Sequence, residues 1–496
     1  MTNDYVLAID QGTTSTRAFV FDPTGQVRSN AAVEIKQYYP KPGWVEHDAD
    51  EIWQSVVSVV KEALANSAIA AEEIRAIGVT NQRETTLLWD RKTGAPAARA
   101  IVWQDRRTAE FCKRHRHEEA WLQERSGLVL DPYFSATKLS WLLENDAELK
   151  GKAVNGDLAF GTVDSFLIWR LTGGKVHATD LTNASRTLLL NLKTGEWDAE
   201  LCRYFGVPER LLPEVRFSAA DFGTTAGLDF LPDGVPICGV AGDQQAALVG
   251  QFGFTEGSAK CTYGTGAFFL VHTGERPILS QHRLVSSLAA SKAGAKQYVL
   301  EGSIFVAGAA VQWLRDGLHL IDKSADIERL AASGDSEQEV YLVPAFVGLG
   351  APYWSPDARG AVFGLTRAAT SAELARAALE GVAFQVADLV EAAAQDMGCS
   401  LENLRADGGM AANAWFLQRQ ADILGIPVLQ ASQNEATAFG AAILAGWQAG
   451  VWSDLEQIER LERPGRRFEP HWPEDRRSRK RQRWRQLVQA VISLGS

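Results

Sequence analysis

The chain has 496 residues, of which 46% are hydrophobic and 22% are charged, and this composition excludes disordered, collagen-like and disulfide-rich miniprotein classes. Its 61 acidic residues outnumber its 50 Lys and Arg residues and give a net charge of −11, which excludes a nucleic-acid binder that depends on a basic surface. The length predicts about three domains or two large ones, and any bound phosphate must be held by local donors.

Five cysteines lie far apart in the sequence and include no CxxC pair, so neither a zinc site nor a disulfide framework is expected. The start of the chain lacks the basic and long apolar regions of a secretion signal, and no apolar stretch is long enough to span a membrane. These patterns predict a cytoplasmic protein that neither inserts stably into a membrane nor binds nucleic acid.

The first motif is a predicted strand–turn–strand unit, with β-prone residues at 5–9 and 17–21 on either side of the polar turn DQGTTST. A glycine in such a turn lets the backbone approach a ligand, and successive N–H groups can bind an anion. The side chains suited to phosphate here are those of Thr13, Thr14, Ser15 and Arg17. Asp10 stands at the strand end and could hold Mg²⁺. A plain polar hairpin turn explains the same residues equally well.

A helix is predicted from Asp48, and a buried strand at 74–80 ends in the polar cluster NQRET. If the chain stays extended there, Arg83 and Glu84 point to opposite faces and could form a surface ion pair. The sharper interpretation is a polyol site, because hydroxyl groups need both donors and acceptors. Further along, Trp103 and Tyr133 offer an aromatic wall and a phenol, although core packing is the commoner role of such residues.

A second strand end carries the sequence GDQQ at 242–245, after an apolar strand at 236–240 and before an alanine-rich helix. Asp243 can cap that helix without any chemical role. It can also lie at the edge of an open α/β sheet where active sites collect.

The second half repeats the opening motif, since a strand at 258–263, a GTG turn and a strand at 267–271 form another hairpin. After each hairpin comes a stretch of mixed strands and long helices, and the two stretches are of similar length, which indicates a duplication. We therefore predict two α/β domains, 1–247 and 248–496, joined by a packed hinge near 242–254 with a cleft between them. The further elements expected in the second half are helices at 371–395, 413–424 and 436–446 and strands at 404–407 and 426–430.

Two other stretches allow more than one interpretation. The glycines of DGGMAAN at 407–413 allow close approach to a nucleotide, but a merely tight loop fits as well. The basic run at 476–486 is most simply a solvated face of a terminal helix.

Taken together, these segments resemble the FGGY family of carbohydrate kinases, and within it the members that act on glycerol. The resemblance runs along almost the whole chain and is carried by DQGTTSTRAFVFD, GVTNQRETT, AIVWQDRRTAE, GLVLDPYFSATK, GVAGDQQAALVGQ, TYGTGAFF, GAAVQWLRD and DGGMAAN. It implies two ribonuclease-H-like, actin-like ATPase domains with a catalytic cleft between them. It also implies ATP-dependent, Mg²⁺-assisted phosphorylation of glycerol to sn-glycerol 3-phosphate by a homo-oligomer, dimeric or tetrameric.

The resemblance assigns roles residue by residue. It implies that the ATP phosphates contact Thr13, Thr14, Ser15, Arg17 and Thr265. It implies that the rest of the nucleotide contacts Gly308, Gln312, Gly409 and Asn413. It implies that glycerol is bound by Arg83, Glu84, Tyr133, Asp243 and Gln244 and is flanked by Trp103 and Phe268. It makes Asp243 the catalytic base and places Asp10 and Asp243 near the metal.

Two regulatory features of some family members are expected to be missing. The stretch at 224–236, which corresponds to a fructose 1,6-bisphosphate loop, has no basic residue to meet two phosphates. Residues 216–225 contain no histidine that a phosphotransferase carrier could phosphorylate. We therefore expect neither form of regulation.

Two alternative functions stay open at this point. The chain could phosphorylate a pentulose or a longer polyol, which a substrate panel would reveal. It could also be an actin-like ATP-binding scaffold or chaperone, in which case ATP turnover would ignore glycerol.

Overall fold

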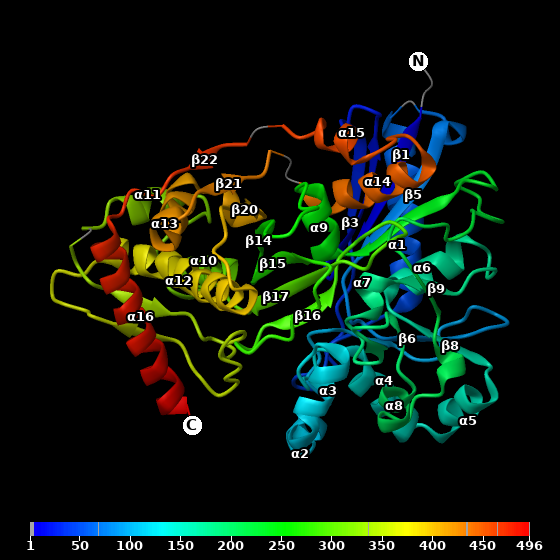
Figure 1. Cartoon of the computed structure of the whole chain (residues 1–496), viewed down its shortest axis with the longest axis horizontal. Helices are drawn as coiled ribbons and strands as arrows, with labels where there is room; N and C mark the ends of the chain where they lie inside the picture. Colours follow the sequence, from blue (N-terminus) through cyan, green and yellow to red (C-terminus); the bar gives the residue numbers. More distant parts are fainter. Residues whose placement is uncertain (1–3, 68, 336, 433–434, 464, 496) are drawn as a thin grey trace.

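Two β-sheets, one from each half of the chain, organise the computed structural model, which describes residues 4–67, 69–335, 337–432, 435–463 and 465–495 (Figure 1). The first sheet has the order β13 (Ile237–Gly242), β5 (Ile74–Asn81), β1 (Tyr5–Gln11), β2 (Ser15–Phe21) and β3 (Val27–Glu34). β1, β2 and β3 are antiparallel, whereas β1, β5 and β13 run parallel. The predicted opening hairpin is thus the centre of a mixed sheet.

The second sheet repeats this connectivity. Its order is β16 (Val285–Leu288), β17 (Tyr298–Ile304), β15 (Ala267–Gly274), β14 (Ala259–Tyr263), β20 (Leu404–Asp407), β21 (Val428–Gln430) and β22 (Arg467–Phe468). β14, β15 and β17 are antiparallel, and β14, β20 and β21 are parallel. The two hairpins therefore occupy equivalent places in two related sheets, as the duplication hypothesis requires.

Helices cover both faces of the first sheet. Alternate residues of a strand face opposite sides, and accordingly Leu7 and Ile9 pack against α1 (Ala49–Ser67) and α6 (Val163–Leu171). Val6 and Ala8 pack instead against α14 (Ala436–Ala449), which comes from the second half of the chain. In Figure 1 this orange helix lies beside the blue strands of the first sheet. The predicted boundary after residue 247 falls inside α9 (Asp243–Gly250), which also contacts α14.

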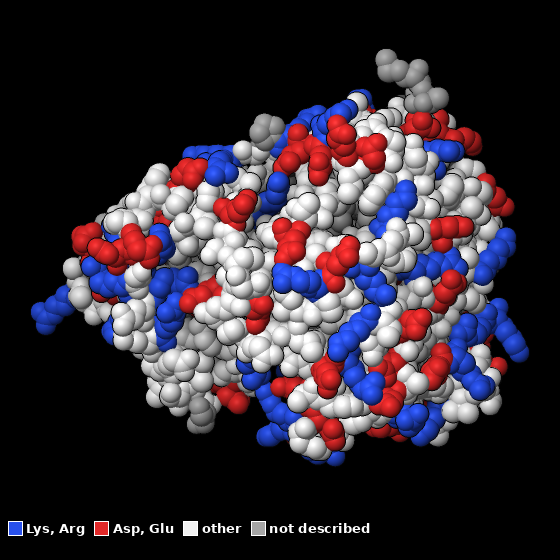
Figure 2. Space-filling view, viewed as in Figure 1, with Lys and Arg blue, Asp and Glu red and all other residues white. Residues whose placement is uncertain are grey.

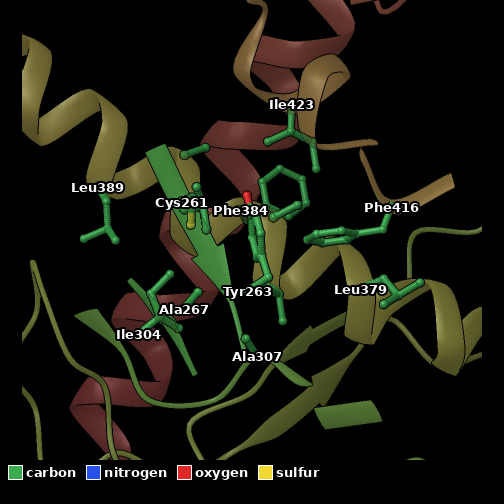
Figure 3. Packing of buried hydrophobic residues seen from close by; sticks show 14 of the residues in the cluster. Cys261, Tyr263, Ala267, Ile304, Ala307, Leu379, Phe384, Leu389, Phe416 and Ile423 are labelled. Atoms are coloured by element: carbon green, nitrogen blue, oxygen red, sulfur yellow. The ribbon is translucent and has the colours of Figure 1, made fainter. Parts of the chain in front are cut away.

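The core of the second half forms between its sheet and the long helix α12 (Ser371–Met397) (Figure 3). Tyr263 of β14 meets the edge of Phe416 at a centroid distance of 5.0 Å, and its hydroxyl donates to Gln420 at 2.8 Å. Phe416 and Gln420 belong to α13 (Ala414–Leu424), so one buried tyrosine joins the sheet to a covering helix.

The terminal helix α16 (Glu474–Gly495) carries the basic run, and the expectation of a solvated face is only partly right. Lys480 is 6% exposed, Trp484 is buried, and Arg481 pairs with Asp388 and Glu391 of α12. The cause is that α12 presents carboxylates to this side of the helix. Figure 2 shows acidic and basic side chains interspersed over one face of the molecule.

The remaining elements complete the two halves. The other α-helices are α2 (Ala109–Arg114), α3 (Glu119–Ser126), α4 (Ser135–Asn145), α5 (Ala147–Asn155), α7 (Leu181–Ala184), α8 (Ala199–Tyr204), α10 (Gly308–Gln312), α11 (Asp326–Ala332) and α15 (Leu455–Glu459). The remaining strands form two-stranded sheets. In the first half these are β4 (Glu46–His47) with β7 (Ala100–Ile101), β6 (Leu87–Asp90) with β8 (Leu158–Gly161), β9 (Ala178–Asp180) with β12 (Glu214–Arg216), and β10 (Leu190–Asn191) with β11 (Glu196–Trp197). In the second half β18 (Tyr341–Val343) pairs with β19 (Ala361–Phe363). Within the described ranges, none of the helices combines the length and apolar character needed to cross a bilayer.

Candidate active site

Three parallel strands of the first sheet deliver the predicted site residues to one edge. The register pairs Asn81 of β5 with Gln11 of β1 and with Gly242 of β13, so the three strands end level with one another. Asp10 precedes one of these ends, and Arg83 and Asp243 follow the other two. The sheet register therefore gathers side chains that lie up to 233 residues apart in the sequence.

Arg83 is the centre of a buried charge network. Its two terminal nitrogens each donate to Glu301 of β17 at 2.7 Å, and Nη1 also donates to Gln245 at 3.1 Å. Its Nε lies 3.1 Å from Oδ1 of Asp243. The side chain runs over Gly242, where an added Cβ would lie 2.5 Å from the arginine Cδ. Arg83 thus links the first half of the chain to a strand of the second.

Glu84 corrects the expectation of an extended chain with opposed side chains. Its φ is +61°, which puts the backbone in the left-handed region. Its carboxylate accepts from Nε of Arg186 at 2.6 Å, and Arg186 also lies 3.4 Å from Glu301. Glu301 binds Arg83 as well, so the left-handed turn brings both side chains into one buried cluster instead of opposite faces.

Asp243 is the first residue of α9, which follows the N-cap residue Gly242. Its Oδ1 accepts from the backbone N–H of Gln244 at 2.7 Å, as a carboxylate at a helix start can. Its side chain also pairs with Arg83 and stays 32% exposed, so it can meet a ligand. The hydrogen bond from Gln244 and the ion pair with Arg83 therefore orient the carboxylate and leave part of it exposed.

Gln244 is held by the second sheet. Lys260 of β14 is completely buried and donates to Oε1 of Gln244 and, at 2.8 Å, to Thr262. Burial lowers the pKa of Lys260, while Asp407 at the end of β20 acts in the opposite direction. The amide of Gln244 is left with its nitrogen as the group available to a ligand.

The predicted aromatic residues lie close together. Trp103 meets Tyr133 edge-on at 5.5 Å between centroids and Phe268 at 6.3 Å. The indole N–H of Trp103 donates to Oγ1 of Thr13 at 2.8 Å, which ties this wall to the opening turn. Burial raises the pKa of Tyr133 beyond its ordinary range, so its phenol stays protonated as a hydrogen-bond donor.

The opening turn has the geometry of a tight loop closed by its own backbone. The N–H of Gly12 donates to the carbonyl of Ser15 at 2.9 Å, and Thr14 is exposed. Arg17 does not stand free for an anion, because its Nη1 pairs with Glu435 at 2.9 Å. The sequence alone gave no sign of this partner, which lies 418 residues further along the chain.

The predicted nucleotide residues come from three places in the second half. The carbonyl of Gly264 accepts from the N–H of Gly308, and the carbonyl of Thr265 accepts from Ala307 and Ala309, so the second turn packs against the start of α10. Gln312 at the end of α10 is exposed.

The other two of these residues follow β20. Gly409 is exposed and has no atom within 4 Å of an added Cβ, so its surroundings are open. Asn413 uses its side-chain oxygen to cap α13, accepting from the N–H of Phe416 at 2.8 Å. Its amide nitrogen can still donate to a ligand.

The candidate metal ligands are two carboxylates. Burial raises the pKa of Asp10 to about 7, Arg17 opposes this, and the charges of Asp243 and Glu435 raise it further. A cation beside these groups would relieve the repulsion and favour the ionised forms. In the described part of the chain no group of three or more His, Cys, Asp or Glu residues is arranged to hold a metal. The donor set fits Mg²⁺, which commonly uses one or two carboxylates together with phosphate oxygens and water.

The sequence motifs missed part of this site. Arg186, Glu301, Lys260 and Gln245 all contact predicted site residues and are all buried. A usable signal was present for Glu301, because a carboxylate stands inside the otherwise uncharged strand YVLEGSI. A charge in a fully buried strand needs a partner, and that need points to a functional or structural ion pair.

Comparisons with known proteins identify the family and the fold of the chain. Models of the N-terminal and C-terminal domains of the FGGY family of carbohydrate kinases match residues 5–250 and 259–449. A glycerol kinase of Deinococcus radiodurans is 52% identical over 98% of this chain and 97% of its own length. The crystal structure of Plasmodium falciparum glycerol kinase with ADP superposes with a TM-score of 0.93, at 36% identity over 98% of both chains. Gluconate kinase from Lactobacillus acidophilus shares the fold, with a TM-score of 0.87 at 21% identity.

Proposed function

The chain belongs to the FGGY family of carbohydrate kinases, and on that basis we propose that it transfers the γ-phosphoryl group of MgATP to glycerol and forms sn-glycerol 3-phosphate. The observation that carries this proposal is the cluster at the sheet edge. There Arg83, Glu84 and Asp243 supply one donor and two acceptors within one small region. The hydroxyl groups of a three-carbon polyol need both hydrogen-bond donors and acceptors. The two glycine-containing turns would hold the phosphate groups of the donor. Relatives named glycerol kinase match almost the whole chain.

Glycerol binding is assigned to seven side chains. We propose that its hydroxyl groups meet Arg83, Glu84, Tyr133, Asp243 and Gln244, and that its carbon chain lies against Trp103 and Phe268. A site built to bond each hydroxyl rejects an analogue lacking one by as much as roughly 10⁴–10⁵, because the unmatched polar groups would stay buried.

Asp243 is proposed as the general base. Its carboxylate accepts the proton of the attacking primary hydroxyl, while Arg83 at 3.1 Å fixes the carboxylate orientation. General-base catalysis of this kind contributes about 10²–10⁴ in rate. Most of the remaining catalysis in phosphoryl transfer comes from positioning and from neutralising charge as the attacking and leaving oxygens align.

The nucleotide is assigned to the two turns and to the second half. We propose that its phosphates meet Thr13, Thr14, Ser15 and Thr265 and that its other parts meet Gly308, Gln312, Gly409 and Asn413. Arg17 joins the phosphate contacts if it exchanges its present partner Glu435 for an anion. Asp10 and Asp243 would hold Mg²⁺, which supplies charge neutralisation on the phosphate oxygens.

The proposal extends to setting and assembly. We place the reaction in the cytoplasm, with a domain boundary at 247/248, and we infer a homo-oligomer, dimeric or tetrameric. Sedimentation at several concentrations measures the last of these, and a strictly monomeric species at all concentrations would refute it.

A substrate panel tests the choice of polyol. We expect kcat/KM to be highest for glycerol among glycerol, a ketopentose, longer polyols and gluconate. A higher value for one of the larger substrates would replace glycerol while keeping the kinase assignment. ATP turnover that ignores every member of the panel would instead favour a shape-changing ATPase scaffold.

A further inference from the structure

We propose that Arg186 and Glu301 are positioning residues of the polyol site, with Glu301 orienting Arg83 and Arg186 orienting Glu84. This inference rests on the proposed function, because it concerns the two side chains assigned to glycerol hydroxyl groups. Arg186 and Glu301 are completely buried, and each contacts a side chain assigned to glycerol, Glu84 and Arg83 respectively, so we assign them a role through these two side chains.

Glu301 holds Arg83 by a two-pronged contact. Both of its oxygens accept from the guanidinium at 2.7 Å, and its side chain has no exposed surface. Paired N–H···O bonds of this kind fix the plane of the guanidinium as well as its position. With both terminal nitrogens so engaged, the orientation of Nε toward Asp243 is set as well.

Arg186 performs the matching task for Glu84. Its Nε donates to Oε1 of Glu84 at 2.6 Å, and its guanidinium carbon lies 5.3 Å from the ring centroid of Tyr133 and 5.0 Å from that of Phe134. Among the described residues its buried Nη1 and Nη2 make no hydrogen bond, although Nη2 forms an ion pair with Oε1 of Glu301 at 3.4 Å. A buried arginine whose terminal nitrogens lack good hydrogen bonds is costly for stability alone. Its position is better explained by the fixed carboxylate that it holds beside the substrate.

The network also joins the two halves of the molecule. Glu301 lies on β17 of the second sheet, whereas Arg83 and Glu84 follow β5 of the first. Arg186 bridges them, being 2.6 Å from Glu84 and 3.4 Å from Glu301. The correct presentation of the polyol ligands therefore depends on the second half being docked against the first.

Charge is part of what Arg186 supplies. Glu84 is faced by Arg83, Arg186, Glu301, Tyr133 and Lys138. Burial raises the pKa of Glu84, and Arg186 is the strongest influence in the opposite direction. Without Arg186 the carboxylate would accept a proton at higher pH and would lose acceptor capacity toward a glycerol hydroxyl.

The experiment compares Glu301→Gln, Arg186→Gln and Arg186→Lys with the wild type. Exposed ion pairs provide matched controls, namely Glu148→Gln and Arg460→Gln. We expect Glu301→Gln to raise the KM for glycerol at least about tenfold while the KM for ATP is unchanged, because a charge-assisted hydrogen bond is lost at the polyol site only. Both controls should match the wild type.

A second readout separates positioning from general structural damage. The dissociation constant of glycerol is measured against pH without nucleotide, by the fluorescence of the wild type and of each variant. In Arg186→Gln, the loss of glycerol affinity at low pH (the acid limb) should begin at a higher pH than in the wild type. Arg186→Lys restores a positive charge, so the acid limb should return toward its position in the wild type.

The outcomes are distinct. A folded Glu301→Gln variant with an unchanged KM for glycerol, or an unmoved acid limb in Arg186→Gln, would overturn the inference. If Arg186→Gln does not fold, Glu301→Gln decides. Failure of the wild type to use glycerol would refute the proposed substrate instead, and the same KM comparison on the polyol it does use would then decide the positioning roles.

Discussion

At the residue scale, the proposed chemistry depends most on one carboxylate. Replacing Asp243 by Asn keeps the size and the acceptor for the N–H of Gln244 but removes the base and its charge toward Arg83. We expect kcat to fall by about 100-fold or more while ATP still binds, given the usual size of general-base effects. Steady-state rates and nucleotide titration measure the two parts, with Asp229→Asn at an exposed ion pair as the control. Retention of more than about a tenth of the rate would exclude Asp243 as the base.

Arg83→Ala tests the substrate contact at the same edge. The KM for glycerol should rise because a donor to the polyol is lost. The variant also leaves Glu301 buried without its two-pronged partner, which should cost about 3–5 kcal/mol of unfolding free energy. Kinetics and urea denaturation report these effects separately, and Arg460→Ala on the surface should show neither. An unchanged KM would show that Arg83 does not contact the substrate.

How far the sequence predicts the site depends on the residue. Arg83 and Asp243 stand at recognisable strand ends within motifs, so their proximity follows from parallel strands that end level. Arg186 and Glu301 have no such context, because their meeting requires the two sheets to be docked together. The left-handed φ of Glu84 was equally hidden, because the hydrogen bond of its carboxylate with Arg186 depends on a residue 102 positions away in the sequence.

At the element scale, the crossing of α9 and α14 joins the two halves by direct backbone contact. An added Cβ on Gly440 of α14 would lie 1.8 Å from the carbonyl oxygen of Ala246, and one on Gly250 would lie 1.9 Å from that of Ala436. No side chain fits between these backbones, so only glycine permits the approach. The helices cannot separate to admit a methyl group without moving α14 off the first sheet.

Gly440→Ala should therefore destabilise the protein by about 2 kcal/mol or more, as overpacking against rigid backbone does. Gly151→Ala is the matched control, because Gly151 lies inside α5 with nothing within 4 Å of an added Cβ. That control should gain roughly 0.5–1 kcal/mol from helix propensity. Urea denaturation measures both variants, and equal stability of Gly440→Ala and the wild type would contradict the tight crossing.

A second element-scale prediction concerns the loop at 224–236. Lys61 of α1 reaches this loop, where its side chain pairs with Asp229 at 2.8 Å. Residues 224–236 themselves carry no basic side chain for two phosphates, so fructose 1,6-bisphosphate should not inhibit the enzyme. Rates measured with increasing concentrations of the sugar check this. Strong inhibition that a substitution in this loop abolishes would contradict it.

The elements themselves were predictable in different degrees. The two glycine–threonine hairpins indicated a duplicated sheet, and the observed strand orders agree. The placement of α14 on the first sheet could not be predicted from its alanine-rich sequence. Such a sequence predicts a helix that is buried on all sides, but it does not indicate which elements the helix packs against. The basic face of α16 was similarly ambiguous until the carboxylates of α12 appeared opposite it.

At the scale of the whole molecule, three histidines should contribute to the dependence of stability on pH. Burial lowers the pKa of His47, His177 and His272 to about 4, whereas in the unfolded chain they titrate near 6.5. The unfolded state therefore binds more protons at these histidines between the two values, so their contribution to stability is complete above about pH 6.5 and falls as the pH drops toward 4. Asp10 and Asp164, whose pKa values burial raises to about 7, act in the opposite sense.

The test is a difference between variants. His47→Gln should flatten the decline of Tm between pH 6.5 and 4 relative to the wild type, because one group that resists protonation in the folded state is gone. His117→Gln serves as the control, since His117 is 70% exposed. Parallel Tm profiles for His47→Gln and the wild type would contradict the assignment.

The central claim is that the two halves form one polyol kinase site, and the most direct test is the release of ADP from MgATP with and without glycerol, with the product identified. We predict that ADP release depends strongly on glycerol and that the product is sn-glycerol 3-phosphate. ADP release at the same rate in the absence of glycerol, with no phosphorylated polyol formed, would contradict the account.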